Sequence, residues 1–273
     1  MKRFLIACDL EGVNNVVGEE YKGLYQGSNE WEIARHQAAL EINAAAEALF
    51  EMGASSVDLW DNHAGGGNID PSELDGRVKL LEVDPKLPRM SFADGYDAIL
   101  YFGYHAMEGT LGGVLAHTMS SAAYQYYKLN GKYVGEVDMD AYIAATHGMP
   151  SCLFVGGDIA CLQAERAVPG IVTVITKKEL SRNKAIFRKN DELFEDIKAG
   201  VGKVMSGEFK PKLLSYPAVM EKSFKRVEDA AKYLERILSF GMKADYINDE
   251  ILGKDAHTVS AELNSIEDFI RCV

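Results

Sequence analysis

Short apolar runs alternate with helix-like segments along most of this 273-residue chain. Strands are predicted at 4–8, 56–60, 79–83, 98–102, 151–155 and 171–175, and helices at 31–52, 137–146, 159–167 and 190–205. Strands that are separated by helices usually pair in parallel, because the helix carries the chain back across one face of the sheet. The sequence therefore predicts a layered α/β/α fold with a largely parallel sheet.

A linker-like stretch at 206–217 contains Gly207, Pro211 and Pro217. Beyond it, strands are predicted at 218–224, 244–247 and 258–262, and helices at 227–239 and 266–271. We expect a main α/β region at 1–205 that carries the functional site, with a smaller C-terminal α/β lobe at 218–273 packed on it. One continuous domain is the alternative.

Composition excludes several classes of partner. The net charge of −12 argues against nucleic acid and anionic membranes, which both need a basic surface. No apolar run approaches the ~20 residues that span a bilayer, and the run after Lys2 and Arg3 stops at Cys8, too early for a signal peptide. The four cysteines lack CxxC spacing, so reduced thiols in a cytoplasmic protein are expected.

The first predicted strand ends in Asp9-Leu10-Glu11-Gly12. In an extended backbone, residues i and i+2 point to the same side, so Asp9 and Glu11 are directed at one place. Two carboxylates held that close repel each other unless a proton or a cation lies between them. A helix cap or a solvated turn is the simpler reading of this motif taken alone.

Other predicted strands end in the same kind of residue. Asp61 and His63 follow the second strand, His105 follows the strand at 98–102, and Glu136 precedes a helix. Ligands of parallel α/β sheets bind outside the carboxyl ends of the strands, so these side chains can converge. Asp61 is expected to support the ring of His63 from outside the site.

Carboxylates and imidazoles without thiolates suit zinc, manganese or cobalt. Each residue also has an ordinary alternative, such as a turn residue, a core histidine or a carboxylate at a helix N-terminus. Their recurrence at strand ends favours a metal centre. With two histidines and three carboxylates available, two metals that share a bridging carboxylate are possible, an arrangement that can activate water and polarise a carbonyl or phosphoryl oxygen.

A histidine beyond these ends is a candidate for proton transfer. His117 lies twelve residues after His105, across a segment with glycines at 109, 112 and 113 that lets the backbone approach a substrate. An imidazole of near-neutral pKa can exchange protons at working pH, although a structural histidine is the alternative. Thr118 is a candidate donor to a developing oxyanion.

Together, Asp-x-Glu-Gly, Asp-x-His, Gly-Tyr-His-Ala, His-Thr-Met and Gly-Glu, in this order between residues 4 and 174, resemble the zinc D-aminopeptidases of the DppA type. The resemblance implies a binuclear metallopeptidase with two zinc ions per chain, manganese or cobalt being alternatives. It implies Asp9, Glu11, His63, His105 and Glu136 as the metal ligands, with Asp9 as the bridge. It also implies His117 as the catalytic residue, acting as nucleophile or base.

The same resemblance implies the substrate and the assembly. The family removes N-terminal D-residues, such as D-alanine, from short peptides, and its members form ring-like homo-oligomers, such as a decamer, whose active sites face an enclosed channel. Two other hypotheses remain open from the residues alone. One is a metal-dependent phosphoesterase or another amidohydrolase, and the other is a non-catalytic protein that binds a peptide or a metal.

Overall fold

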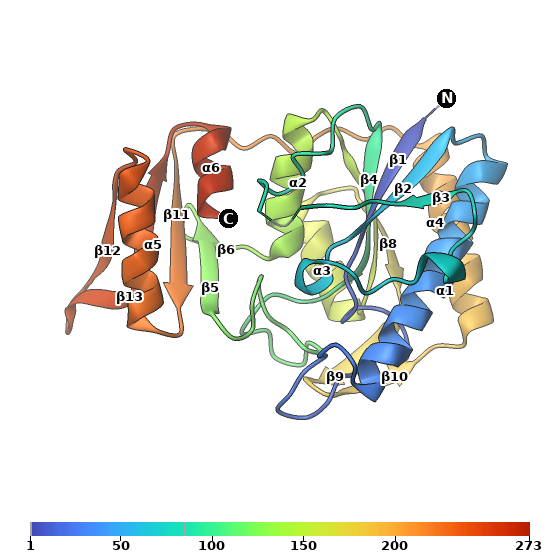
Figure 1. Cartoon of the computed structure of the whole chain (residues 1–273), viewed down its shortest axis with the longest axis horizontal. Coiled ribbons are helices and arrows are strands. Elements are labelled where there is room, and N and C mark those ends of the chain that lie inside the picture. Colours follow the sequence, from blue (N-terminus) through green and yellow to red (C-terminus); the bar gives the residue numbers. More distant parts are fainter. Residues whose placement is uncertain (1, 85) are drawn as a thin grey trace.

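The computed structural model describes residues 2–84 and 86–273, while Met1 and Pro85, both within the predicted region 1–205, lie outside the described residues. The described strands form a six-stranded sheet, a five-stranded sheet and a two-stranded hairpin. Figure 1 shows the six-stranded sheet between helices and the five-stranded sheet beside it, at the left of the view. The predicted α/β fold class is confirmed.

The six-stranded sheet is parallel throughout, in the order β3-β2-β1-β4-β7-β8. Its strands are β1 (Arg3–Cys8), β2 (Ser56–Asp61), β3 (Val78–Leu80), β4 (Ala98–Tyr104), β7 (Ser151–Gly156) and β8 (Val172–Ile175). Helices α1 (Asn29–Glu51) and α4 (Asn190–Ser206) pack together on one face, and α2 (Glu136–Thr146) and α3 (Asp158–Ala167) contribute to the core on the other. Each of these elements was predicted from the sequence, with ends that differ by a few residues.

Residues of β1 alternate between the two faces of the sheet. Phe4, Ile6 and Cys8 belong to the core under α1 and α4. Leu5 and Ala7 belong to the core on the α2 side. Because a strand repeats every two residues, Asp9 is turned away from Cys8, as the sequence predicted for this buried cysteine.

The C-terminal lobe is built around an antiparallel sheet in the order β12-β13-β11-β5-β6. Its elements are β5 (Tyr124–Leu129), β6 (Lys132–Tyr133), β11 (Ala218–Phe224), β12 (Ala244–Asp249), β13 (Gly253–Leu263), α5 (Val227–Ser239) and α6 (Ile266–Cys272). Two of these strands, β5 and β6, come from the region predicted to be separate from the lobe. The division at 205 and 218 therefore stays a prediction.

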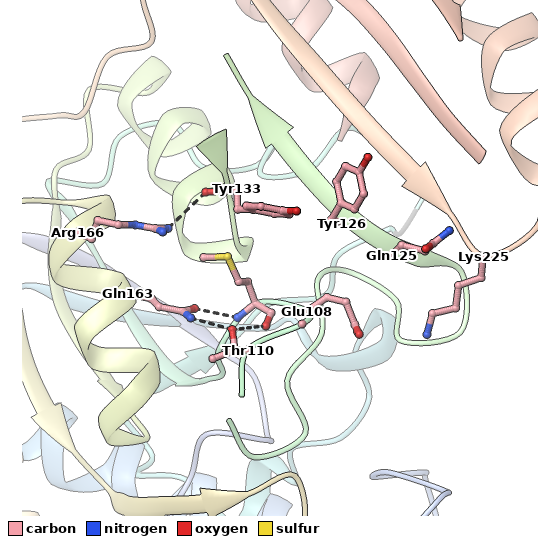
Figure 2. A pocket seen from close by; sticks show the side chains of 10 residues that line it. Glu108, Thr110, Gln125, Tyr126, Tyr133, Gln163, Arg166 and Lys225 are labelled. Carbon is pink, nitrogen blue, oxygen red and sulfur yellow. Dashed lines mark hydrogen bonds between the residues drawn. The ribbon is translucent and has the colours of Figure 1, made fainter. Parts of the chain in front are cut away.

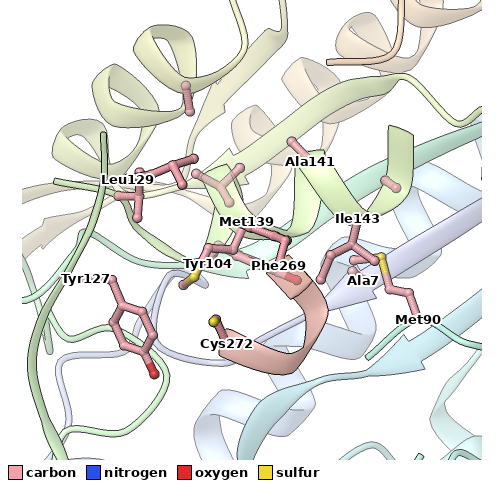
Figure 3. Packing of buried hydrophobic residues seen from close by; sticks show 14 of the residues in the cluster. Ala7, Met90, Tyr104, Tyr127, Leu129, Met139, Ala141, Ile143, Phe269 and Cys272 are labelled. Atoms are coloured by element: carbon pink, nitrogen blue, oxygen red, sulfur yellow. The ribbon is translucent and has the colours of Figure 1, made fainter. Parts of the chain in front are cut away.

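The core on the α2 side continues into the lobe. Figure 3 shows Phe269 and Cys272 of α6 close to Met139 and Ile143 of α2, and Tyr127 of β5 lies in the same cluster. Burial of apolar area is the main force that holds such elements together. The lobe is thus joined to the parallel sheet by a shared hydrophobic core.

A hairpin that the sequence analysis did not predict follows β8. It consists of β9 (Lys177–Ser181) and β10 (Lys184–Phe187), which pair antiparallel. Figure 1 shows it at the lower edge of the molecule, beside the loop that follows β1. None of the helices in the described ranges is long and apolar enough to cross a membrane.

Candidate metal centre

All five predicted metal ligands meet at the carboxyl ends of β1, β2 and β4. Nδ1 of His63 lies 2.9 Å from Oδ1 of Asp9 and 3.2 Å from Oε2 of Glu11. Nε2 of His105 lies 3.5 Å from Oδ2 of Asp9 and 3.4 Å from Oε1 of Glu136. The two carboxylate oxygens of Asp9 therefore face two different histidines.

Close backbone packing brings Asp9 into this position. The amide of Asp9 donates to the carbonyl of Phe102 at 2.8 Å, and the amide of Gly12 donates to the carbonyl of Gly103 at 2.6 Å. A Cβ atom on Gly103 would lie 1.9 Å from the carbonyl oxygen of Asp9, and its φ of +69° is in the left-handed region. Only glycine fits there without displacing the first candidate ligand.

The site carries opposing charges that shift the pKa values of its members. Burial would raise the pKa of Asp9, but the neighbouring imidazoles of His105 and His63 lower it well below its usual range. Burial would lower the pKa of His63, but Glu11 and Asp9 raise it to about 11. The carboxylates of Glu136 and Asp9 likewise overcome burial and raise the pKa of His105. The buried carboxylates therefore favour positive charge beside them, and divalent cations would supply such charge at this site.

The donor atoms fit a pair of metal ions. Two groups of three donors, each group within 4.8 Å, share Asp9: one is completed by Glu11 and His63, the other by His105 and Glu136. Nδ1 of His105 lies 3.0 Å from the carbonyl of Ala106. Its Nε2 is buried and makes no hydrogen bond of good geometry with the described residues. A buried nitrogen in that state is costly unless something binds it, so it is suited to be a ligand.

His117 lies directly against this cluster. Its ring stacks on His105, with centroids 3.9 Å apart and an angle of 11° between the planes. Nδ1 faces the carbonyl of Leu115 at 2.9 Å, which places the proton on that nitrogen, and Nε2 lies 4.0 Å from Oε1 of Glu136. Leu115 and Met119 have φ values of +50° and +64°. Such strain on both sides of His117 is typical of functional sites.

Asp61 and Thr118 occupy supporting positions. The carboxylate of Asp61 accepts from the backbone and side-chain nitrogens of Asn68 at 2.6 and 2.9 Å, and Asn68 also donates to the carbonyl of His63 at 2.7 Å. Asp61 therefore supports the His63 loop through Asn68, whereas contact with the ring was expected. Oγ1 of Thr118 accepts from the amide of Glu108 at 3.1 Å, and Thr118 is absent from the lining of the cavity at the site. The expected oxyanion contact gains no support from this position.

Lys177 supports the site and was not predicted from the sequence. Its side chain is fully buried, and Nζ donates to the carbonyls of Glu11, Val13 and Val16 at 2.6, 2.9 and 2.7 Å. Burial lowers the pKa of Lys177 to about 8. This ammonium group holds the loop that carries Glu11. Nothing in the surrounding polar sequence distinguishes Lys177 from a surface lysine.

The same hairpin also braces the loop at 109–117. Glu179 accepts from the amide of Val114 at 2.6 Å. Arg182 donates from Nη1 to the carbonyl of Ala116 at 2.8 Å, and its own carbonyl accepts from the amide of Leu115 at 2.9 Å. Contacts from β9 and from the turn that follows it thus support the loop that carries Glu11 and the loop that carries His117.

A cavity of about 270 Å³ opens over the cluster. Larger cavities of about 830, 880, 490 and 560 Å³ also lie among the described residues, and these four contain none of the five candidate ligands. Figure 2 shows the cavity of about 830 Å³. It is bordered by α3, by β5 and by the loop that carries Glu108 and Thr110, and the side chain of Gln163 donates to Thr110 there at 2.9 Å. The donor set, and not the size of the cavity, is therefore the reason to choose this cavity as the candidate site.

Comparisons with known proteins identify a family and a shared fold. A family model described as D-aminopeptidase, peptidase family M55, matches residues 1–239. A D-aminopeptidase from Bacillus subtilis (strain 168) is 27% identical over 185 residues, which cover 66% of this chain and 65% of that protein, just under two thirds of its length.

A solved structure also shares the fold. It is described as the Zn-dependent D-aminopeptidase DppA from Bacillus subtilis, a self-compartmentalizing protease, and it aligns with a TM-score of 0.83 at 22% identity. The match covers 99% of this chain and 94% of that one. The likeness thus extends over both sheets.

Proposed function

This chain belongs to the D-aminopeptidase family, and we propose that it hydrolyses the N-terminal residue, a D-amino acid such as D-alanine, from short peptides at a centre of two metal ions. The family predicted from the sequence motifs is confirmed by the family match. The observation that carries the proposal is the position of Asp9, which belongs to two of the three groups of three donors that could hold a metal ion. A bridging carboxylate is typical of hydrolases with two metals.

In this proposal Asp9, Glu11 and His63 hold one ion, and Asp9, His105 and Glu136 hold the other. Zinc is favoured by the donor types and by the zinc dependence of the Bacillus subtilis protein. Manganese and cobalt are compatible with the same donors. Bound metals would polarise the scissile carbonyl and lower the pKa of a water molecule.

His117 would act as the general base or the nucleophile. The carbonyl of Leu115 holds the proton on Nδ1, which leaves the lone pair of Nε2 available on the side of Glu136. Stacking on His105 keeps the ring in one orientation. A base or nucleophile needs this combination of a defined tautomer and a fixed ring.

We further propose a cytoplasmic, ring-like homo-oligomer, such as a decamer, that binds neither nucleic acid nor membrane. The description of the Bacillus subtilis structure as self-compartmentalizing supports an assembly. Tyr21 and Leu111, on loops that follow β1 and β4, are 98% and 97% exposed in the single chain, and large exposed apolar side chains are common at interfaces. Native mass spectrometry measures the number of chains.

A hydrolysis panel tests the activity. Matched D- and L-alanyl peptides and a phosphate ester are incubated with the protein, with and without a chelator. We expect cleavage of the D-alanyl peptides, loss of that cleavage on chelation and recovery on addition of zinc. The proposal fails if the purified protein contains no metal and binds none on addition, and phosphate-ester cleavage alone would favour the phosphoesterase hypothesis.

His117→Ala tests the role of the histidine. We expect the variant to keep its metal and to lose activity by about 10²–10⁴-fold, the usual contribution of a general base. His147→Ala is a matched control, because His147 contacts Asp94 at 2.6 Å, away from the cluster. Full activity of His117→Ala would contradict the assigned role.

A further inference from the structure

The cavity over the candidate metal ligands is lined by positively charged side chains that have no part in the proposed reaction. Its acidic residues, Asp9, Glu11 and Glu136, are all candidate ligands. Its lysine and arginine residues, among those that the structure describes, are Lys22 and Arg182. Once metals neutralise the carboxylates, these two side chains give the cavity mouth a positive charge, which suits an anionic group on the substrate.

Arg182 is held in place and still has free bonding capacity. One Nη1–H group donates to the carbonyl of Ala116 at 2.8 Å, and the amide of Leu115 donates to the Arg182 carbonyl at 2.9 Å. A guanidinium group carries five N–H donors in a planar fork that matches a carboxylate. The side chain thus lines the cavity beside the loop of His117, and among the described residues it donates to the carbonyl of Ala116 alone, which leaves its other N–H groups for a ligand.

Lys22 is less suited to the same task. Its Nζ lies 3.3 Å from Oε2 of Glu19 and 5.8 Å from the ring centre of Tyr25. The ammonium charge is therefore already shared with a neighbouring carboxylate, and a single ammonium lacks the fork geometry of arginine. This difference makes Lys22 a matched control for Arg182.

Size also limits what the cavity accepts. Its volume of about 270 Å³ lies just below the range of typical small-molecule pockets, about 300–1,000 Å³. An extended dipeptide spans about 7 Å, at about 3.3–3.6 Å per residue. A substrate whose amino end lies at the metals would therefore present its carboxylate at the wall of the same cavity.

We propose that Arg182 binds the C-terminal carboxylate of the substrate and so makes the site selective for dipeptides with a free carboxyl group. This inference rests on the proposed aminopeptidase function. It assigns specificity to the turn after β9, whereas the metals and His117 carry out the hydrolysis.

The experiment compares two substrates that differ in one group, D-alanyl-D-alanine and D-alanyl-D-alaninamide. The wild-type protein is expected to favour the free carboxylate in kcat/KM by about 10–100-fold, the usual effect of a charge-assisted contact. Arg182→Met is expected to raise KM for the dipeptide by a similar factor and to change KM for the amide by less than about threefold. Arg182→Lys should be intermediate, and Lys22→Met should preserve the preference.

The ratio between the two substrates separates binding from loop support. A loosened His117 loop would lower kcat for both substrates equally, so an unchanged ratio in Arg182→Met would overturn the inference. A wild-type protein that cleaves both substrates equally well would also overturn it. If the wild-type protein cleaves neither, the proposed function itself fails. Metal content is measured for every variant, so that loss of the cluster is recognised.

Discussion

Two buried lysines, one beside the parallel sheet and one in the C-terminal lobe, have different surroundings. Lys177 lies beside the parallel sheet, where its ammonium group contacts three backbone carbonyls of the loop after β1. Lys222 lies in the lobe, where Nζ donates to the main-chain oxygens of Cys272 and Val273 at 3.3 and 3.2 Å. Nζ also lies 4.4–5.7 Å from the centres of four aromatic rings, those of Tyr124, Tyr127, Phe224 and Tyr233.

The groups that contact a buried lysine determine which property of the protein depends on it. Burial lowers the pKa of both side chains, to about 8 for Lys177 and about 7 for Lys222. Lys177 donates hydrogen bonds to the loop that carries the candidate ligand Glu11, whereas Lys222 contacts residues of the lobe. We therefore expect changes near Lys177 to affect the metals and activity, and changes near Lys222 to affect stability alone.

Gly103→Ala should have the largest effect. The new Cβ would overlap the carbonyl of Asp9, at 1.9 Å, in a left-handed conformation that L-residues rarely adopt. A displacement of about 1 Å in a catalytic group costs about 10²-fold in rate, so activity should fall at least that far, together with metal content. Metal analysis and peptide hydrolysis measure both, and normal values would show that the approach of β4 to Asp9 is unimportant.

Lys177→Met should have the second-largest effect on metal binding and activity. Three carbonyls would lose their donor, and each unsatisfied buried group costs about 1–3 kcal/mol. Metal affinity should fall by about 10–100-fold, as it does when groups that support a ligand are removed. Lys178→Met, at the exposed neighbouring position on the same strand, is the control. Equal metal affinities of the two variants would break the comparison.

Lys222→Met should leave activity within about twofold and change how stability depends on pH. The pKa of Lys222 is about 7 in the folded protein and 10.5 in the reference state, so between these values the unfolded chain binds more protons. Wild-type stability should therefore gain up to about 1.4 kcal/mol per pH unit from this residue. Urea unfolding at pH 7, 8 and 9 should show that the variant lacks this gain, and parallel curves for the two proteins would refute it.

Gly131→Ala should have the smallest effect. Gly131 also has a positive φ, +76°, but no atom of the described residues lies within 4 Å of its Cβ position. Only the backbone strain remains, about 1 kcal/mol of unfolding free energy. Thermal unfolding measures this cost, and unchanged hydrolysis is the expected control. A loss of metal in Gly131→Ala would show that the lobe influences the site more than its contacts indicate.

Sequence patterns were sufficient for the parallel sheet and for the convergence of the candidate ligands at one edge of it. The apolar runs that became β1, β2 and β4 lie within two residues of their predicted ends. Because parallel strands end at the same edge, the residues that follow them had to converge, and Asp9, His63 and His105 do so. Strand periodicity and the topology of parallel sheets supplied this result.

The remaining elements depend on contacts that one sequence does not reveal. The hairpin of β5 and β6 did have a signal, Asn130-Gly131, which is a preferred two-residue turn with φ values of +50° and +76°. Lys177 and Arg182 had none, because a charged residue in a polar stretch is most often exposed. Asp61 was expected against the His63 ring, but its partner Asn68 is defined only by the folded loop.

The hydrogen bonds of Lys177 reach loop residues 161–166 positions earlier in the chain. All five candidate ligands lie between residues 9 and 136, so they leave the ribosome well before that lysine does. A nascent chain that ends at β7 would contain every donor and lack the ammonium group that holds the loop of Glu11. We therefore expect the candidate metal centre to be completed only after β9 has been synthesised.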